Sequence, residues 1–232
     1  FVLSSIITIT KFNFSNSIAV LDLSWNTFTS HKILSWVSSF TPKLVDLDLS
    51  ANNLKGSSNM STHSAVVMNS LEQLDLSSNG FQGGDLKSFM NTSMMNSLEQ
   101  LDLHSNELNG EDLKSFMNAC SLHSLNMGST NLSQDLPSIL GNLSLGCIRY
   151  SLQELDFSSN SITGTLSGLS KFRLLKRVDL SYNQLSGKIP EDAKLPPHLE
   201  YVSMESNSLE GSIPTSVFEN TCNLSSLKLD YV

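Results

Sequence analysis

One pattern of residues recurs along the whole chain and restricts its possible folds more than any other feature. The pattern is Leu-x-x-Leu-x-Leu-x-x-Asn, with other apolar residues at some Leu positions, and successive copies begin 23–30 residues apart. Repeats of this length form stacked coils in which each unit buries its apolar side chains against its neighbours. The nine copies begin at Ile18, Leu44, Leu71, Leu98, Leu122, Leu152, Leu175, Leu199 and Leu224. We therefore predict one solenoid over residues 1–232.

Two neighbouring units are near copies of each other. Residues 68–94 and 95–121 both begin MNSLEQLDL and both contain DLKSFMN further on. This similarity indicates the duplication of a single 27-residue unit. A solenoid tolerates such an event because each coil contacts only the coils beside it.

The Leu-x-Leu alternation within each copy predicts a short strand with one buried face, because side chains alternate between the two faces of a strand. The Asn that follows must turn the chain out of the strand. Its amide both donates and accepts, so it can satisfy buried backbone groups at the turn. We expect a ladder of stacked side chains at Asn26, Asn52, Asn79, Asn106, Asn160, Asn183 and Asn207. Thr130 replaces Asn in the fifth copy and is expected to break the ladder.

The segment after the ladder Asn carries a second pattern that identifies the type of repeat. The string LSYNQLSGKIP, residues 180–190, resembles the plant-specific leucine-rich repeat of receptor-like proteins and receptor kinases. Finer features are similar to cell-surface immune receptors of the fungal-xylanase-receptor type, namely Cys120 at a repeat start and Cys147 at the end of the longest linker. The resemblance implies an α/β-type, right-handed superhelix. Its short parallel strands would line the inner side, and 3-10 helices and loops the convex side.

Charge and hydropathy argue against two other classes of protein. The net charge is −8 and the pI is about 5.0, whereas a nucleic-acid surface needs clustered Lys and Arg. The longest apolar run, within Phe1 to Ile9, falls well short of the roughly 20 residues that span a membrane. The chain starts without Met and stops at Val232, one strand into a repeat. We interpret it as an interior segment of a longer protein, without capping repeats.

Six Asn-x-Ser/Thr sequons indicate an extracellular or secretory location, although some sequons arise by chance in a chain rich in Asn and Ser. All six lie outside the predicted inner strands, where a glycan could be accommodated. They are Asn13, Asn59, Asn91, Asn131, Asn142 and Asn223.

The cysteines leave two possibilities open. Cys120 lies two residues before its repeat start and Cys147 five before the next, so both are expected near one rim of adjacent coils. Neighbouring strands lie about 4.8 Å apart, which suits the roughly 4.4–6.8 Å Cα separation of a disulfide. The pair either closes the longest linker as a disulfide or stays as two buried thiols. Cys222, four coils from Cys120, is expected to be unpaired within the chain.

No arrangement of residues points to catalysis or to a metal site. The five histidines fall in different repeats, and no zinc-protease spacing, phosphate-binding loop or nucleophile elbow is present. We predict a binding scaffold that is not an enzyme and has no cofactor. A column of acids could hold a cation or raise the pKa of its members, but neighbouring Ser hydroxyls can solvate it, so we predict no metal. The column is Asp22, Asp48, Asp75, Asp102, Asp156 and Asp179.

Ligand specificity is expected where the inner face departs from Asp and Ser. These positions are Trp25 in the first copy and Arg177, Tyr182, Tyr201 and Glu205 in the seventh and eighth. Aromatic residues and Arg are enriched at binding hot spots, and adjacent coils would bring Arg177 and Tyr201 within reach of each other. The alternative is a solvated Arg beside a Tyr that only packs on its neighbour.

The resemblance implies a ligand-binding ectodomain segment of a plant cell-surface receptor-like protein that functions in pathogen perception and defence signalling. Its parent would be a single-pass membrane protein on the extracellular face of the plasma membrane. Its partners would be a protein or peptide ligand, which a microbe could supply, and co-receptor kinases. Two alternatives remain: the ectodomain of a receptor kinase for a hormone or peptide, and a secreted inhibitor of cell-wall-degrading enzymes. Fold analogy supplies the scaffold and leaves the ligand open.

Overall fold

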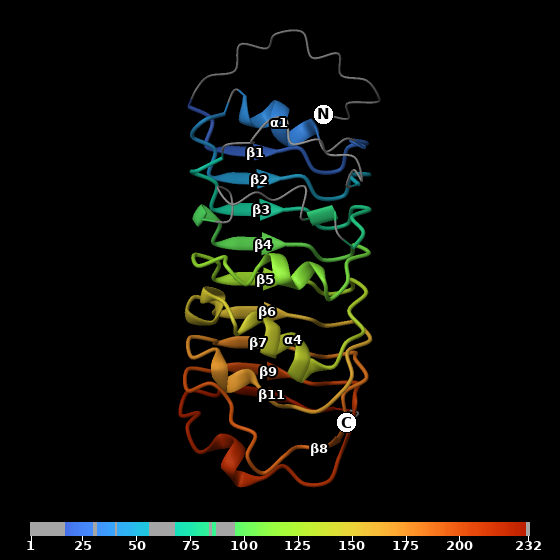
Figure 1. Cartoon of the computed structure of the whole chain (residues 1–232), viewed down its shortest axis with the longest axis vertical. Helices are drawn as coiled ribbons and strands as arrows, with labels where there is room; N and C mark the ends of the chain where they lie inside the picture. Colours follow the sequence, from blue (N-terminus) through green and yellow to red (C-terminus); the bar gives the residue numbers. More distant parts are fainter. Residues whose placement is uncertain are drawn as a thin grey trace.

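Nine parallel strands form one sheet that runs the length of an elongated molecule (Figure 1). The computed structural model describes residues 17–29, 32–39, 41–55, 68–83, 85–86 and 96–230. The strands follow one another in chain order, from β1 to β7 and then β9 and β11. The predicted solenoid of short parallel strands is therefore confirmed.

Each strand is three residues long and comes from one copy of the repeat. Its central residue pairs with the central residue of the next strand, as Leu74 does with Leu101. The strands are β1 (Val20–Asp22), β2 (Asp46–Asp48), β3 (Gln73–Asp75), β4 (Gln100–Asp102), β5 (Ser124–Asn126), β6 (Glu154–Asp156), β7 (Arg177–Asp179), β9 (Tyr201–Ser203) and β11 (Ser226–Lys228). The unbroken register stacks equivalent side chains of all nine copies into columns.

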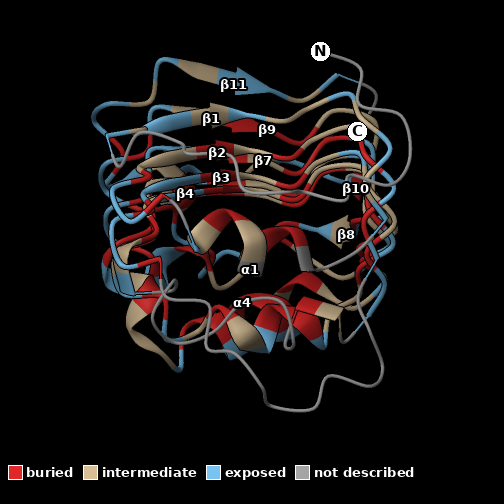
Figure 2. Cartoon of the chain, turned by 90° about the horizontal axis from the view of Figure 1, so that it is seen from above, coloured by how far each residue is buried: buried red, intermediate tan, exposed pale blue. Residues whose placement is uncertain are grey.

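The core lies between this sheet and the helices and loops on the opposite side of the coils (Figure 2). The central strand residues Leu47, Leu101 and Val178 are buried, as the alternation predicts. Leu21 of β1 is only partly buried, because among the described coils it has a covering neighbour on one side alone. The free energy of burial is thus shared between adjacent coils rather than concentrated in one centre.

Among the described residues, the convex side combines the predicted 3-10 helices with the α-helices α1 (Lys32–Ser38) and α4 (Leu136–Leu143). The 3-10 helices are η1 (Asp112–Ser115), η2 (Cys147–Tyr150), η3 (Leu169–Lys171) and η4 (Thr215–Phe218). Helix α4 begins where the Asp135 side chain accepts a hydrogen bond from the Ser138 amide, with Pro137 in the first turn. Both features favour a helix start. The 30-residue spacing of this copy supplies the chain that α4 requires.

A second, two-stranded sheet lies beside the main one and is not foreseen by the Leu pattern. Strand β8 (Ser186–Lys188) pairs in parallel with β10 (Ser208–Glu210). These segments follow the ladder Asn of the seventh and eighth coils. The same neighbourhood in other coils forms single bridges, such as Gln82 with Glu107. The second sheet gives these two coils another row of backbone hydrogen bonds.

The Asn side chains form hydrogen bonds both within a coil and between coils. Asn106 Nδ2 donates to the Leu103 carbonyl of its own coil at 2.9 Å and to the Leu76 carbonyl of the preceding coil at 3.0 Å. Its Oδ1 accepts from the Phe81 amide at 3.1 Å. The same three bonds recur at Asn52, Asn79, Asn160, Asn183 and Asn207. Asn26 donates to two carbonyls of its own coil.

Thr130 preserves only part of this pattern. Its hydroxyl lies 2.9 Å from the Met127 carbonyl and 3.1 Å from Asn160 Oδ1. Within the described coils it bonds neither the Leu103 carbonyl nor the Leu108 amide, the two groups of the preceding coil that an Asn side chain would reach.

Replacing Thr130 by Asn is therefore expected to stabilise the protein by about 1–2 kcal/mol, because each of two restored hydrogen bonds contributes about 1 kcal/mol net. Urea-induced unfolding followed by circular dichroism measures the change. The exposed neighbour Asn131→Thr serves as the control and should leave the midpoint unchanged. An unaltered midpoint for Thr130→Asn would mean that water already satisfies both groups.

Candidate functional site

The inner face of the sheet presents three outward-facing positions from each coil, which form three columns. The first column is Val20, Asp46, Gln73, Gln100, Ser124, Glu154, Arg177, Tyr201 and Ser226. The second is Asp22, Asp48, Asp75, Asp102, Asn126, Asp156, Asp179, Ser203 and Lys228. The third, two residues further on, is Ser24, Ser50, Ser77, His104, Gly128, Ser158, Ser181, Glu205 and Asp230. A shallow hollow of about 610 Å³ runs over the first two columns from Val20 to Tyr201.

The predicted acid column is present, and its aspartates have a structural role. Each accepts a hydrogen bond from the backbone amide two residues later, as Asp48 does from Ser50 at 2.8 Å. The expected solvation by Ser hydroxyls is found at both ends of the column, where Ser24 and Ser181 donate to Asp22 and Asp179. Asn126 interrupts the column and donates to Asp102 Oδ2 at 2.9 Å. These hydrogen bonds hold the carboxylates in place.

Two carboxyl groups on this face are harder to ionise than usual. Burial raises the pKa of Asp102 above its ordinary value, and the charge of Asp75 adds to the effect. Burial likewise raises the pKa of Asp46, followed by the charges of Asp48 and Asp75. For both groups desolvation is the larger cause, and the neighbouring carboxylates are the smaller one. In the part of the chain that the structure describes, no three His, Cys, Asp or Glu side chains are grouped to hold a metal ion.

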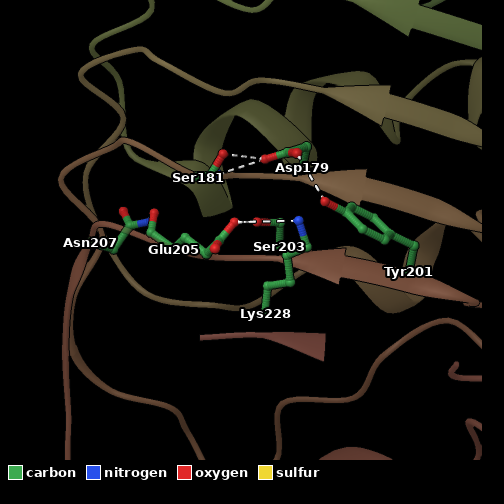
Figure 3. A network of polar contacts seen from close by, with 7 residues as sticks. All are labelled: Asp179, Ser181, Tyr201, Ser203, Glu205, Asn207 and Lys228. Carbon is green, nitrogen blue, oxygen red and sulfur yellow. Dashed lines mark hydrogen bonds and ion pairs between the residues drawn. The ribbon is translucent and has the colours of Figure 1, made fainter. Parts of the chain in front are cut away.

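Two basic residues enter the otherwise acidic inner face in the last three coils, and Figure 3 shows one of them, Lys228, near Tyr201. The Arg177 guanidinium carbon lies 4.3 Å from the centre of the Tyr201 ring, so the two residues come together as predicted. Lys228 Nζ lies 5.7 Å from the same ring centre and 3.8 Å from Glu205 Oε2. We call Arg177, Tyr201 and Lys228 the cation cluster. Glu205 also belongs to this neighbourhood and accepts a hydrogen bond from the Ser203 hydroxyl at 3.1 Å.

Lys228 is the functional candidate that sequence reasoning missed. It lies in the ninth copy, of which the sequence contains only residues 224–232, too few to show the whole repeat. Its signal was available: Lys228 pairs in register with Ser203, which in turn pairs with Asp179, so a basic residue occupies the acid column. Comparing the columns rather than the single repeats reveals the substitution.

Trp25 and Tyr182 are exposed and do not line the hollow, so a ligand contact at either residue stays a prediction. Both directly precede a ladder Asn and have a backbone φ of +54°, a left-handed conformation shared by this position in eight coils. Their backbone amides donate to the Ser50 and Glu205 carbonyls of the next coil. Their side chains are 81% and 62% exposed, so burial does not compensate the conformational cost of a bulky residue there. They lie six coils apart and do not form one site.

The remaining predicted sites are on the outside of the coils. Cys120 and Cys147 are joined in a disulfide with a Cα separation of 5.0 Å. Cys222 is an exposed free thiol. The sequons at Asn131, Asn142 and Asn223 are exposed, and those at Asn13, Asn59 and Asn91 lie outside the described residues. Glycosylation at all six stays a prediction.

None of the described helices has the length and apolar character needed to cross a bilayer.

Comparisons with known proteins agree with this architecture. The Leucine Rich Repeat family model matches residues 70–92, 97–119, 151–172 and 174–194. Receptor-like protein 41 of Arabidopsis thaliana is 35% identical over 98 residues, which cover 41% of this chain and 10% of that protein. The chain therefore spans about a tenth of the length of this relative.

Two solved structures of plant receptor kinases also resemble the chain. The ectodomain of GASSHO1/SCHENGEN3 from Arabidopsis thaliana, in complex with CASPARIAN STRIP INTEGRITY FACTOR 2, has a TM-score of 0.61 and 25% identity and covers 92% of this chain and 27% of its own. The second is the Arabidopsis receptor kinase HAESA in complex with the peptide hormone IDA and the co-receptor SERK1. Its TM-score is 0.53 and its sequence identity 27%, and the match covers 92% of this chain and 37% of the HAESA chain. Together with the nine-stranded sheet and its Asn ladder, these similarities show that the chain has a leucine-rich-repeat solenoid fold, similar to that of plant receptor ectodomains.

Proposed function

We propose that the chain is a ligand-binding segment of the extracellular region of a plant receptor-like protein, and that its inner face binds a protein or peptide. The observation that carries this proposal is the cation cluster on an otherwise acidic inner face. Both resembling receptor kinases were solved in complex with another molecule, a peptide hormone in the case of HAESA. Binding rather than catalysis is the chemistry that this surface supports.

The wider setting of the function follows from the same resemblance. The parent protein would sit in the plasma membrane with a single span, expose this segment and its glycans to the outside, and signal through co-receptor kinases. Perception of a microbial ligand in defence, as in receptors of the fungal-xylanase-receptor type, is the role we favour. A receptor kinase ectodomain for a hormone or peptide is the second candidate, because both resembling solved structures are receptor kinases.

Blocking the inner face with a bulky group is expected to abolish peptide binding. Gln100 is exposed in the first column, so Gln100→Cys provides an attachment point for a polyethylene glycol maleimide. Cys222→Ser removes the one exposed free thiol from the background. The probes are peptides selected from a random phage-displayed library on the unmodified chain. Biolayer interferometry should show at least a roughly tenfold loss of affinity, or about 1.4 kcal/mol.

The matched control carries the same group on the convex side. Ser138 is exposed on α4, and polymer attached at Ser138→Cys should leave the affinity within about twofold. If the polymer on Ser138 blocks binding and the polymer on Gln100 does not, the inner face is the wrong surface.

A further inference from the structure

We propose that the cation cluster is a subsite for an acidic side chain of the ligand. This inference rests on the proposed function and adds to it the chemistry of one contact. Three features support it: the stacking of the Arg177 guanidinium on Tyr201, the second cation at Lys228, and the acidity of the surrounding face.

Arg177 is held in a conformation that leaves its hydrogen-bonding edge available. Its direct neighbour in the sheet is Glu154, yet among the described residues no ion pair joins the two. The guanidinium stacks on Tyr201 instead, at 4.3 Å from the ring centre. Stacking uses the flat face of the group and leaves the N–H groups at its edge, whose geometry matches both oxygens of a carboxylate. The ring thereby orients Arg177 in advance and lowers the entropy lost on binding.

Lys228 adds a second positive charge from two coils further on. Its side chain is roughly half exposed and pairs with Glu205 only at 3.8 Å, a weak contact. A lysine is protonated at physiological pH, and Tyr201, followed by Glu205, raises the pKa of the Lys228 ammonium further. Asp179, Glu205 and Asp230 carry three negative charges on the same coils. The attraction for a ligand carboxylate therefore comes from its direct contact with the two cations and not from the net charge of this corner.

The rest of the inner face excludes acidic groups. Six of the nine positions in the second column are Asp, and Asp46 and Glu154 add two more carboxylates in the first. A ligand carboxylate would be repelled along these coils, because bringing like charges together across an interface is unfavourable. An acidic side chain is thus directed to the cation cluster, while neutral and basic parts of the ligand fit over the other coils. Repulsion and attraction together set the position of the ligand.

Nuclear magnetic resonance of the arginine side chains tests the subsite directly. The full chain contains only three arginines, Arg149, Arg173 and Arg177, so its Nε–H spectrum is simple. Titration with N-acetyl-glutamate methylamide should shift the Arg177 signal with a Kd on the order of 10 mM, typical of a single exposed contact. N-acetyl-glutamine methylamide, which lacks the charge, should shift the signal at least about tenfold less at equal concentration.

Three further measurements make the result decisive. Lys228→Gln should weaken the glutamate response about threefold, whereas the exposed Arg173→Gln, an equal change of charge outside the inner face, should leave it unchanged. Equal shifts at all three arginines, or equal responses to glutamate and glutamine, would overturn the proposal. So would tighter binding of N-acetyl-alanine, because the site would then select a terminal carboxylate.

The outcome can be separated from that of the proposed function. Peptide binding that depends on a free inner face, without a specific glutamate response at Arg177, would overturn the subsite alone. A glutamate response at Arg177 with peptide binding that ignores the polymer on Gln100 would overturn the proposed binding face and leave the subsite.

Discussion

Replacing Asn52 by Ala is expected to lower the free energy of unfolding by about 3 kcal/mol, because three hydrogen bonds at about 1 kcal/mol each are lost. The Asn52 side chain donates to the Leu23 and Leu49 carbonyls at 3.0 Å and accepts from the Phe28 amide at 3.1 Å. Asn52 is only 6% exposed, so water cannot readily replace these bonds. Urea-induced unfolding of the parent protein and of the Asn52→Ala variant, compared at equal m-value, measures the difference in the free energy of unfolding.

The adjacent residue provides a closely matched control. Asn53 has the same side chain one position further along, but it is exposed. Its own contact with the neighbouring coil is a backbone bond to the Phe28 carbonyl, which Ala retains. Asn53→Ala should therefore change the free energy of unfolding by less than about 0.5 kcal/mol. Equal effects of the two substitutions would show that the ladder does not stabilise the stack.

The double replacement of Cys120 and Cys147 by Ser is expected to destabilise the protein by about 3.5 kcal/mol on the chain-entropy model. The disulfide closes a loop between residues 27 apart in the sequence and thereby restricts the unfolded chain. This loop contains β5 and α4, and its closure ties Cys147 of η2 to the preceding coil. Thermal unfolding of the variant and of the oxidised parent provides the comparison.

Cys222→Ser is the control for the chemistry of cysteine itself. Cys222 is exposed and free, so this variant should unfold at the same temperature as the parent. Adding a reductant to the parent should reproduce the melting temperature of the double variant. A double variant that melts with the parent would place the stability of this region in the packing of α4 alone.

The strands could be predicted because their information is local and periodic. Alternation such as that of Leu47 and Leu49 defines both the buried face and the register, and each further copy repeats the evidence. The pairing of Arg177 with Tyr201 follows from the same register. Helix α4 was also within reach, since Asp135 and Pro137 are ordinary signals of a helix start.

Other features depend on interactions that a single repeat does not display. Strands β8 and β10 are joined by backbone bonds, and no apolar alternation marks them. The backbone conformation of Trp25 and Tyr182 is a left-handed one that most residues avoid, and the Leu pattern does not predict it. The position of Lys228 in the acid column becomes visible only when equivalent positions of successive coils are compared.

The two duplicated units carry a consequence for how such a receptor can change. Their strands β3 and β4 present the same Gln and Asp at equivalent positions, and Gln73, Leu74 and Asp75 pair with Gln100, Leu101 and Asp102. Unequal recombination between the two copies would add or remove one whole coil without creating a mismatched junction. Each such event would move the cation cluster by one strand spacing, about 4.8 Å, relative to the first coils. A change in the number of duplicated units would thus alter the distance between the two ends of the inner face in fixed steps.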